Sequence, residues 1–153
     1  MTRVKLQLPT NFPFRTEIPI RISDINYGGH LGNDAVLSIV HEARVQFFRH
    51  LGYSELDIEG MGIIMTDAVV VYSSESFYGD VLMVEVGTTD FQLTHCDVIF
   101  RLTNSITKKE VARVKTGIAF INKQTHKIAV MPDAFRKKCE AADTSPALRS
   151  FAS

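Results

Sequence analysis

The chain has 153 residues, a length that fits one domain, and its 45% hydrophobic and 22% charged residues are ordinary for a globular protein. Lysine and arginine together number 17, as do aspartate and glutamate, so the formal net charge is zero. This balance argues against a nucleic-acid partner, which usually meets a basic domain or stripe. No run of 18 apolar residues occurs, so neither a membrane-spanning helix nor a membrane partner is expected.

The N-terminus lacks the sustained apolar stretch and the small-residue cleavage site of a signal peptide. Cys96 and Cys139 occur in no Cys-x-x-Cys pair and in no Cys/His ligand spacing. We therefore expect a cytoplasmic protein with two reduced thiols. No ligand-spaced set of His, Cys, Asp and Glu is visible, so no metal is predicted.

Residues Phe14–Ser23 alternate between apolar and polar side chains, which predicts a half-buried strand. Pro19 has no N–H group and would fit best on an edge strand or at a bulge. The segment Tyr27–Gly32 then interrupts the pattern with three glycines, which allow a ligand to approach the backbone closely.

A long helix is predicted after this turn. Asn33 or Asp34 can cap its start, and Gly52 fits the position after its end at about Leu51. Its apolar stripe is broader than that of an ordinary surface helix, so we expect a sheet to wrap around it. The stripe comprises Val36, Leu37, Ile39, Val40, Ala43, Phe47, Phe48 and Leu51, and the narrower polar face comprises Glu42, Arg44, Gln46 and Arg49.

The second half of the chain is rich in β-branched and aromatic residues, which favour strands. Four strands are expected, at Ile63–Ser73, Val81–Phe91, Cys96–Thr103 and Val111–Asn122. The turns between them, at 78–80, 92–95 and 104–110, are short enough for hairpins, so the sheet is expected to be mainly antiparallel. A short helix is predicted from Pro132, and fraying beyond Ala141. These elements predict one α+β domain over residues 1–153, with a core at about 14–140.

The turn and the helix resemble the hotdog-fold acyl-CoA thioesterases, the group that includes 4-hydroxybenzoyl-CoA thioesterase. That group's motif runs Asp-x-Asp-x-x-Gly-His-x-Asn-Asn into a helix ending in Glu-Ala-Arg. Here the corresponding residues are Asp24–Asn33 and Glu42-Ala43-Arg44, and Tyr78–Leu82 resembles the group's Gly-Asp-x-Leu turn. The likeness covers roughly Thr16–Lys137. It implies an antiparallel sheet around a central helix, with active sites at the interface of a homodimer or a dimer of dimers.

Two positions depart from the motif. The resemblance implies a nucleophile or general base at the second aspartate, which is Asn26 here, and Gly32 stands where an asparagine is usual. A neutral amide cannot accept a proton from water, whereas a positioned base typically contributes about 10²–10⁴ in rate. Asp24 lies two residues earlier, on the same face of an extended segment, so it either serves as the base or fixes the turn.

The other candidate site residues follow from the same motif. The resemblance favours Asn26, as a group that orients water or the acyl carbonyl, over a local turn contact, and it gives His30 a role on the carbonyl. Backbone N–H groups at the helix start, with Asn33 the matched position, suit an oxyanion. Further candidates for substrate binding are Gly28, Gly29, Gly32, Asp34 and, across a dimer, Asp67. Asp34 alternatively only caps the helix, and Glu42 is a further carboxylate that a dimer would bring to the site.

The function expected from the resemblance is hydrolysis of an acyl-CoA to a free acid and coenzyme A, with no cofactor beyond the coenzyme A of the substrate. The first alternative is a hotdog module that binds an acyl thioester with little turnover, which Asn26 favours. A hydratase is less favoured, because its Asp-x-Asn-Pro-x-His motif has a proline that is absent here.

Overall fold

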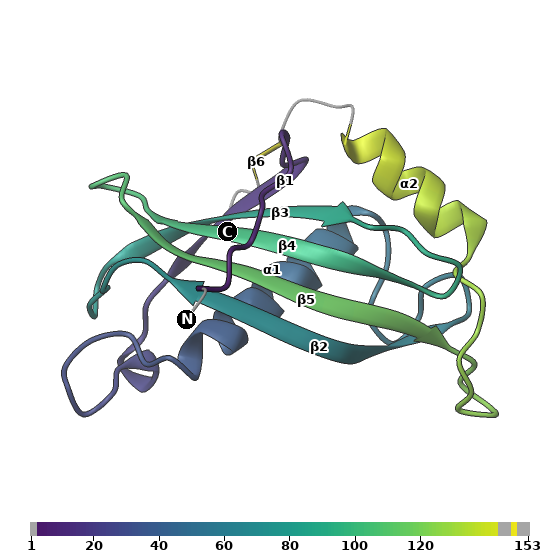
Figure 1. The fold of residues 1–153 in the computed structure, drawn as a ribbon, viewed down its shortest axis with the longest axis horizontal. Helices are drawn as coiled ribbons and strands as arrows, with labels where there is room; N and C mark the ends of the chain where they lie inside the picture. The colour runs from purple at the N-terminus through teal and green to yellow at the C-terminus, as the bar shows by residue number, and fades with distance from the viewer. Residues whose placement is uncertain (1–2, 144–147, 150–153) are drawn as a thin grey trace.

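The computed structural model describes residues 3–143 and 148–149, and within them the chain forms one sheet with two α-helices. The sheet order is β2-β5-β4-β3-β1-β6 (Figure 1). All neighbouring strands are antiparallel except β1 and β6, which pair in parallel through two residues. The elements are β1 (Phe14–Pro19), η1 (Ile22–Asp24, a 3-10 helix), α1 (Ala35–His50), β2 (Gly62–Tyr72), β3 (Val81–Thr89), β4 (His95–Asn104), β5 (Glu110–Ile121), α2 (Asp133–Asp143) and β6 (Leu148–Arg149).

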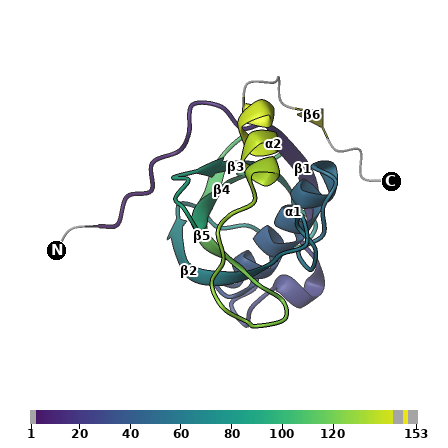
Figure 2. The same cartoon turned by 90° about the vertical axis from the view of Figure 1, so that its right-hand side faces the viewer.

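The sheet curves around α1, as the end-on view shows (Figure 2). This confirms the predicted α+β architecture of a long helix wrapped by an antiparallel sheet. The helix ends where Gly52 takes a left-handed φ of 91°, and the N–H groups of Gly52 and Tyr53 bond back to Arg49 and Phe48. These two bonds form the glycine-dependent helix end that the sequence predicts.

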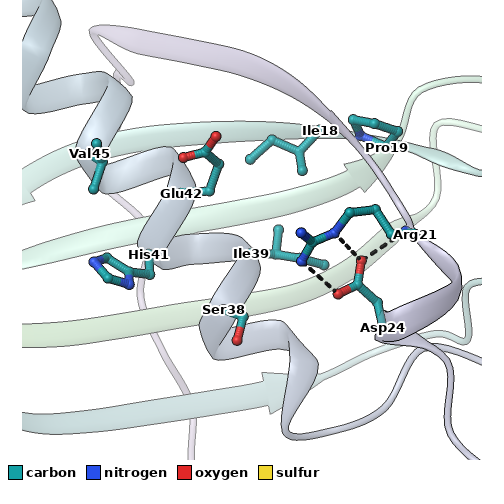
Figure 3. A pocket seen from close by; sticks show the side chains of 9 residues that line it. All are labelled: Ile18, Pro19, Arg21, Asp24, Ser38, Ile39, His41, Glu42 and Val45. Carbon is teal, nitrogen blue, oxygen red and sulfur yellow. Dashed lines mark hydrogen bonds and ion pairs between the residues drawn. The ribbon is translucent and has the colours of Figure 1, made fainter.

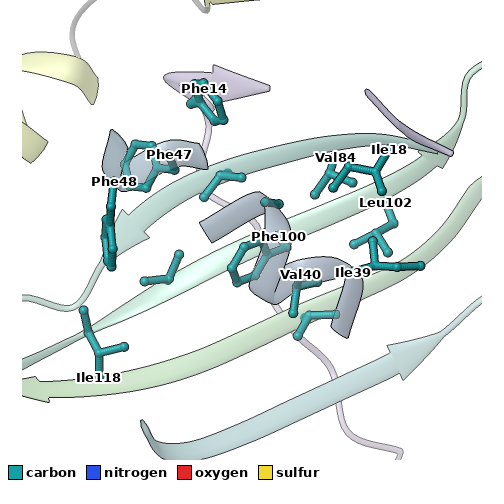
Figure 4. Packing of buried hydrophobic residues seen from close by; sticks show 14 of the residues in the cluster. Phe14, Ile18, Ile39, Val40, Phe47, Phe48, Val84, Phe100, Leu102 and Ile118 are labelled. Atoms are coloured by element: carbon teal, nitrogen blue, oxygen red, sulfur yellow. The ribbon is translucent and has the colours of Figure 1, made fainter. Parts of the chain in front are cut away.

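The core lies between α1 and the sheet (Figure 4). Helix residues Val40, Ala43, Phe47 and Phe48 are fully or almost fully buried, and Phe100 of β4 contributes a fifth buried side chain to the same cluster. Burying one such aliphatic or aromatic side chain contributes about 1.5–3 kcal/mol. The wrapped sheet therefore explains the broad apolar stripe of α1, except for Leu37, which was expected in the stripe but is 41% exposed.

Two expectations for the first strand and the helix need correction. β1 ends at Pro19 rather than Ser23, because the chain turns into η1, and Ile22 is 69% exposed instead of continuing the buried face. Arg44, expected on the polar face of the helix, is buried and pairs with Glu55 of the following connector. That partner compensates the charge, which is what burial of an arginine requires.

The expected hairpin at Tyr78–Asp80 is also wrong. β2 pairs with β5, whereas β3 pairs with β4 and β1, so the strands on either side of this turn are not neighbours in the sheet. The connection carries the chain from one edge of the sheet to its other half. The β3–β4 and β4–β5 hairpins form as predicted.

The C-terminal part begins with α2, which starts at Asp133, directly after Pro132. Cys96 and Cys139 are free and buried, and burial raises the pKa of both thiols, that of Cys139 to about 12. The fraying expected beyond Ala141 falls mostly on residues 144–147 and 150–153, which lie outside the described residues. Among the helices of the described residues, none is long and apolar enough to cross a membrane.

Candidate active site

The turn before α1 is fixed by Asp24, whose side chain is only 4% exposed. Its Oδ2 accepts a hydrogen bond of 2.8 Å from the backbone N–H of Arg21, and the Arg21 guanidinium donates to both carboxylate oxygens at 3.1 and 3.3 Å. These contacts raise the pKa of Arg21, mainly through the hydrogen bond. Both oxygens of Asp24 are therefore engaged, in the way expected of a carboxylate that holds the turn.

Asn26 organises the glycine-rich part of the turn. Its backbone N–H donates to the His30 carbonyl at 2.9 Å, and its Oδ1 accepts from the N–H of Gly28 at 2.9 Å. Gly29 follows with a left-handed φ of 86°, which glycine adopts without strain. The Asn26 oxygen thus makes the local turn contact, while its amide NH₂ has no hydrogen-bond acceptor among the described residues.

His30 packs on this turn and is half-buried. Its Nε2 lies 3.7 Å from a carboxylate oxygen of Glu75, and its ring meets Phe77 edge-on at a centroid distance of 6.3 Å. A Cβ atom at Gly28 would lie 3.4 Å from the His30 ring, so glycine gives the ring its place against the backbone. The structure therefore brings Asp24, Asn26 and His30 into one short turn.

The start of α1 is left open. Asp34 occupies the N-cap position but makes no side-chain cap hydrogen bond, and the first turn contains no acidic residue. Within residues 3–143 and 148–149, the backbone N–H groups of Asn33 and Asp34 have no acceptor. Tyr72 of β2 instead donates to the carbonyl of Asn33 at 3.0 Å. The predicted capping by a side chain is thus wrong, and the N–H groups remain available to an anionic or partially negative atom.

Gly32 contributes to this open helix start. Its N–H donates to the carbonyl of Asp24 at 2.9 Å, which ties the helix start to the buried turn. A Cβ atom at this position would lie 2.6 Å from the Asp34 carboxylate, which fills the space beside the glycine. A larger residue at position 32 therefore requires Asp34 to move.

A cavity of about 490 Å³ lies beside the turn, between α1 and the end of β1 (Figure 3). One wall of α1 lines it with Ser38, Ile39, His41, Glu42 and Val45, and the other side is formed by Ile18, Pro19, Arg21 and Asp24. The volume lies in the range of small-molecule sites. Unlike Asp24, the Glu42 carboxylate has no hydrogen bond or ion pair within the described part of the chain, although its charge contributes to the raised pKa of Arg21.

The turn motif of the sequence does not include Ser38, His41 and Val45. With Glu42 they repeat every three to four residues, so they form one stripe on α1, opposite the buried stripe. This spacing is visible in the sequence, but it is also the spacing of an ordinary solvent-facing stripe. Only the position of β1 and the turn makes it the wall of a cavity.

Asp67 lies apart from the turn. It sits on β2 at an irregularity of the pairing with β5, where its carboxylate accepts from the N–H of Gly117 at 3.1 Å and lies 3.4 Å from the Lys115 ammonium. Its role in substrate binding across a dimer stays a prediction. Within the described residues, no three His, Cys, Asp or Glu side chains gather to hold a metal ion.

The sequence between residues 20 and 139 matches the family model of the thioesterase-like superfamily. This match spans most of the chain, which therefore belongs to the thioesterase-like superfamily. No relative is found among curated protein sequences.

Several solved structures share the fold. Slr0204, a 1,4-dihydroxy-2-naphthoyl-CoA thioesterase from Synechocystis, superposes with a TM-score of 0.78 at 18% identity, over 86% of this chain and 98% of its own. SAV2348 from Staphylococcus aureus, solved in complex with CoA, gives 0.79 at 15% identity, over 96% and 93% of the two chains. YbaW, a probable thioesterase from Escherichia coli, gives 0.68 at 16% identity, over 85% and 98%. At these identities the likeness establishes the hotdog fold predicted from the sequence.

Proposed function

We propose that the protein is an acyl-CoA thioesterase that hydrolyses an acyl-CoA to a free acid and coenzyme A. The observation that carries the proposal is the open N-terminus of α1, which the Gly32 N–H ties to Asp24, a residue that lines the α1 cavity together with Glu42. Membership of the thioesterase-like superfamily and the CoA complex of the structurally similar SAV2348 support the same chemistry.

The acyl group would occupy the cavity along α1, with its carbonyl oxygen at the N–H groups of Asn33 and Asp34. Attack of water on a thioester carbon moves negative charge onto this oxygen, and two preorganised N–H donors at a helix N-terminus stabilise it. One such donor typically contributes about 10²–10³ in rate. The amide of Asn26 and the ring of His30 would orient the water and the carbonyl.

Two carboxylates line the cavity and are candidates for the general base. Asp24 must break its contacts with Arg21 before it can accept a proton, whereas Glu42 has no hydrogen-bond or ion-pair partner to release among the residues that the structure describes. The contacts therefore favour Glu42 as the base that takes a proton from water, and Asp24 as the residue that holds the turn. In the resulting step, water adds to the acyl carbon, its proton passes to the base, and the thiolate of coenzyme A leaves.

An acyl-thioester-binding module with little turnover is the second candidate. Asn26 favours it, because this position carries a carboxylate in the motif that the turn resembles. Binding of the thioester would use the same cavity and the same helix N-terminus. The two candidates differ only in turnover.

We also propose a homodimer that forms along the edge strand β2. This strand is 11 residues long and, within the described residues, pairs with β5 alone. It exposes Ile64 and Met65 by 41% and 44%. A long edge with exposed apolar side chains is a template for pairing with a second copy. Pairing of two β2 strands would also place Asp67 of one protomer beside its partner. The two buried free thiols are compatible with the expected cytoplasmic location.

The test is release of free thiol, followed with a disulfide dye, from a panel of short, medium, long and aromatic acyl-CoAs. We expect steady release with catalytic amounts of protein, and a loss of about 10²–10⁴ in kcat for Glu42→Gln. Asn26→Asp is measured alongside. If Asn26→Asp hydrolyses acyl-CoA and the unchanged protein does not, the binding module is the correct function. If Asp24→Asn abolishes turnover in a fully folded protein and Glu42→Gln does not, Asp24 is the base.

A further inference from the structure

A row of charged side chains crosses the face of the sheet that points away from α1. Arg15 of β1 lies directly opposite Glu85 of β3, Glu85 lies opposite Arg101 of β4, and Arg101 lies opposite Arg113 of β5. Two arginines directly opposite each other on neighbouring strands destabilise a sheet unless anions compensate them. Each arginine of this row therefore needs a counter-charge.

Two of the three arginines have partners. The Arg101 guanidinium pairs with Glu85 at 2.7 Å and lies over the Phe12 ring, 5.3 Å from its centroid. Arg113 pairs with Glu110 at 3.0 Å and donates to the carbonyl of Leu6 at 3.1 Å. Each of the two glutamates is thereby already bound to one arginine.

Arg15 has no such partner. Its Nε is buried without a hydrogen bond, and none of its other atoms makes an ion pair within the described residues. Glu85, its cross-strand neighbour, is engaged with Arg101. A buried, charged donor without an acceptor is costly, and guanidinium forks bind phosphate and carboxylate groups through paired hydrogen bonds. Arg15 is thus a half-buried cation without a counter-ion among the described residues.

The residues around Arg15 enclose a cavity of about 440 Å³. It is separated by the sheet from the cavity on α1, and the β4–β5 hairpin that lines one side lies at the same end of the molecule as the turn before α1 (Figure 1). Three cations face two carboxylates, and three neutral polar residues add donors. The lining residues are Arg15, Met83, Glu85, Arg101, Thr103, Asn104, Ser105, Lys108 and Glu110.

We propose that this cavity binds a phosphorylated small molecule, with a phosphate group held between Arg15 and Lys108. Phosphate fits better than a carboxylate, because its oxygens can accept from the fork of Arg15, the ammonium of Lys108 and the neighbouring hydroxyls at once. The volume is that of a small-molecule site rather than of a lone ion. The phosphate comes either from the nucleotide end of coenzyme A or from a separate phosphorylated molecule.

Calorimetric titration of the full-length protein at low salt tests the site without any turnover. The probes are pyrophosphate and adenosine 3′,5′-bisphosphate, with adenosine as the uncharged control. We expect the phosphate probes to bind and adenosine not to bind. Arg15→Gln and Lys108→Gln should each weaken binding about tenfold, since each removes one charge-assisted hydrogen bond.

Arg49→Gln is the matched control, because it removes an arginine that lies exposed on α1, away from the cavity, with the same change in net charge. Its affinity for the probes should stay within twofold of the unchanged protein. Lys108 lies in an exposed hairpin, so Lys108→Gln keeps the test valid if Arg15→Gln does not fold. Failure of both phosphate probes to bind, or equal weakening in Arg49→Gln, would overturn the proposal.

Probe affinities and the kinetics of the Arg15→Gln variant identify the source of the phosphate. If adenosine 3′,5′-bisphosphate binds at least tenfold more tightly than pyrophosphate, and Arg15→Gln raises KM for an acyl-CoA while kcat stays unchanged, coenzyme A supplies the phosphate. If both probes bind alike and KM does not change, the ligand is a separate phosphorylated molecule. Either result supports the site, and binding remains measurable even if no acyl-CoA is hydrolysed.

Discussion

At the scale of single residues, Asp24 and Glu42, the two carboxylates of the α1 cavity, differ in their contacts. Asp24 is buried, and through Arg21 it fixes the turn that ends in the open helix N-terminus. Glu42 is exposed to the cavity and supports no other residue within the described chain. We therefore expect changes at Asp24 to lower mainly the stability of the fold, and changes at Glu42 to lower mainly the turnover.

We expect Asp24→Asn to lower the free energy of unfolding by about 1–3 kcal/mol, because the buried network loses its negative charge and one of its two acceptor oxygens. Arg21→Gln should cost less, since this side chain is 67% exposed, and the double variant should cost little more than Asp24→Asn alone. Glu42→Gln, the matched control, should stay within about 0.5 kcal/mol. Urea denaturation measures all four. If Asp24→Asn leaves the free energy of unfolding unchanged, the structural role of Asp24 is contradicted.

At the scale of elements, α2 packs Phe135 and Cys139 into the core and carries a titrating group, Asp143, in its last turn. Burial, and then the nearby charge of Glu140, raise the pKa of Asp143 to about 6. The backbone carbonyl of the same residue accepts a hydrogen bond of 2.7 Å from the side chain of Asn11. The helix end is thus linked to the N-terminal segment and is sensitive to charge on Asp143.

The raised pKa of Asp143 makes the stability of the fold depend on pH in a defined direction. Between an ordinary carboxyl pKa of about 4 and the folded value of about 6, the folded state holds a proton that the unfolded state has lost, so this residue's contribution favours folding at low pH and is lost as the pH rises to 6. The shift corresponds to about 2–3 kcal/mol, and partial exposure of the carboxylate reduces this to about 1 kcal/mol.

Asp143→Asn should remove this contribution. We expect the variant to match the unchanged protein near pH 4 and to exceed it in stability by about 1 kcal/mol at pH 7. Glu17→Gln, on the exposed face of β1, is the control for loss of one carboxylate. Thermal unfolding at both pH values gives the comparison, and a difference that does not depend on pH would contradict the assignment.

At the scale of the whole molecule, β2 leaves one edge of the sheet open. Its middle residues are exposed on both faces, so neither α1 nor the rest of the described chain covers them. The proposed dimer would bury this edge, and lysines on an edge strand oppose such pairing. The interface can therefore be tested by adding charge to β2 without changing the core.

We expect the chain to sediment as a dimer, and Met65→Lys with Ala68→Lys to shift it to a monomer at the same concentration. Leu56→Lys with Leu93→Lys is the control, because these side chains are 82% and 71% exposed away from β2 and the net charge changes equally. Analytical ultracentrifugation distinguishes the species. A control pair that dissociates as completely as the β2 pair would rule out the edge as the specific contact.

The sequence by itself determined the two α-helices, strands β1 to β5 apart from the end of β1, and the position of the turn. Apolar spacing predicted α1 and the strands, and Gly52 predicted the end of the helix, because periodicity and left-handed φ are properties of a few consecutive residues. The motif from Asp24 to Asn33 located the turn for the same reason. Which of its side chains act in catalysis stays a prediction.

Only the tertiary structure decided the features that depend on which distant segments become neighbours. The stripe of Ser38 and Glu42 becomes a cavity wall because β1 lies opposite it, and Arg44 is buried because Glu55 reaches it. The chain also passes from β2 to a non-adjacent strand, where a short turn predicted a hairpin. Arg15 and Arg101 share a row solely through strand register, which is set by long-range pairing and not by the residues next to each of them in the sequence.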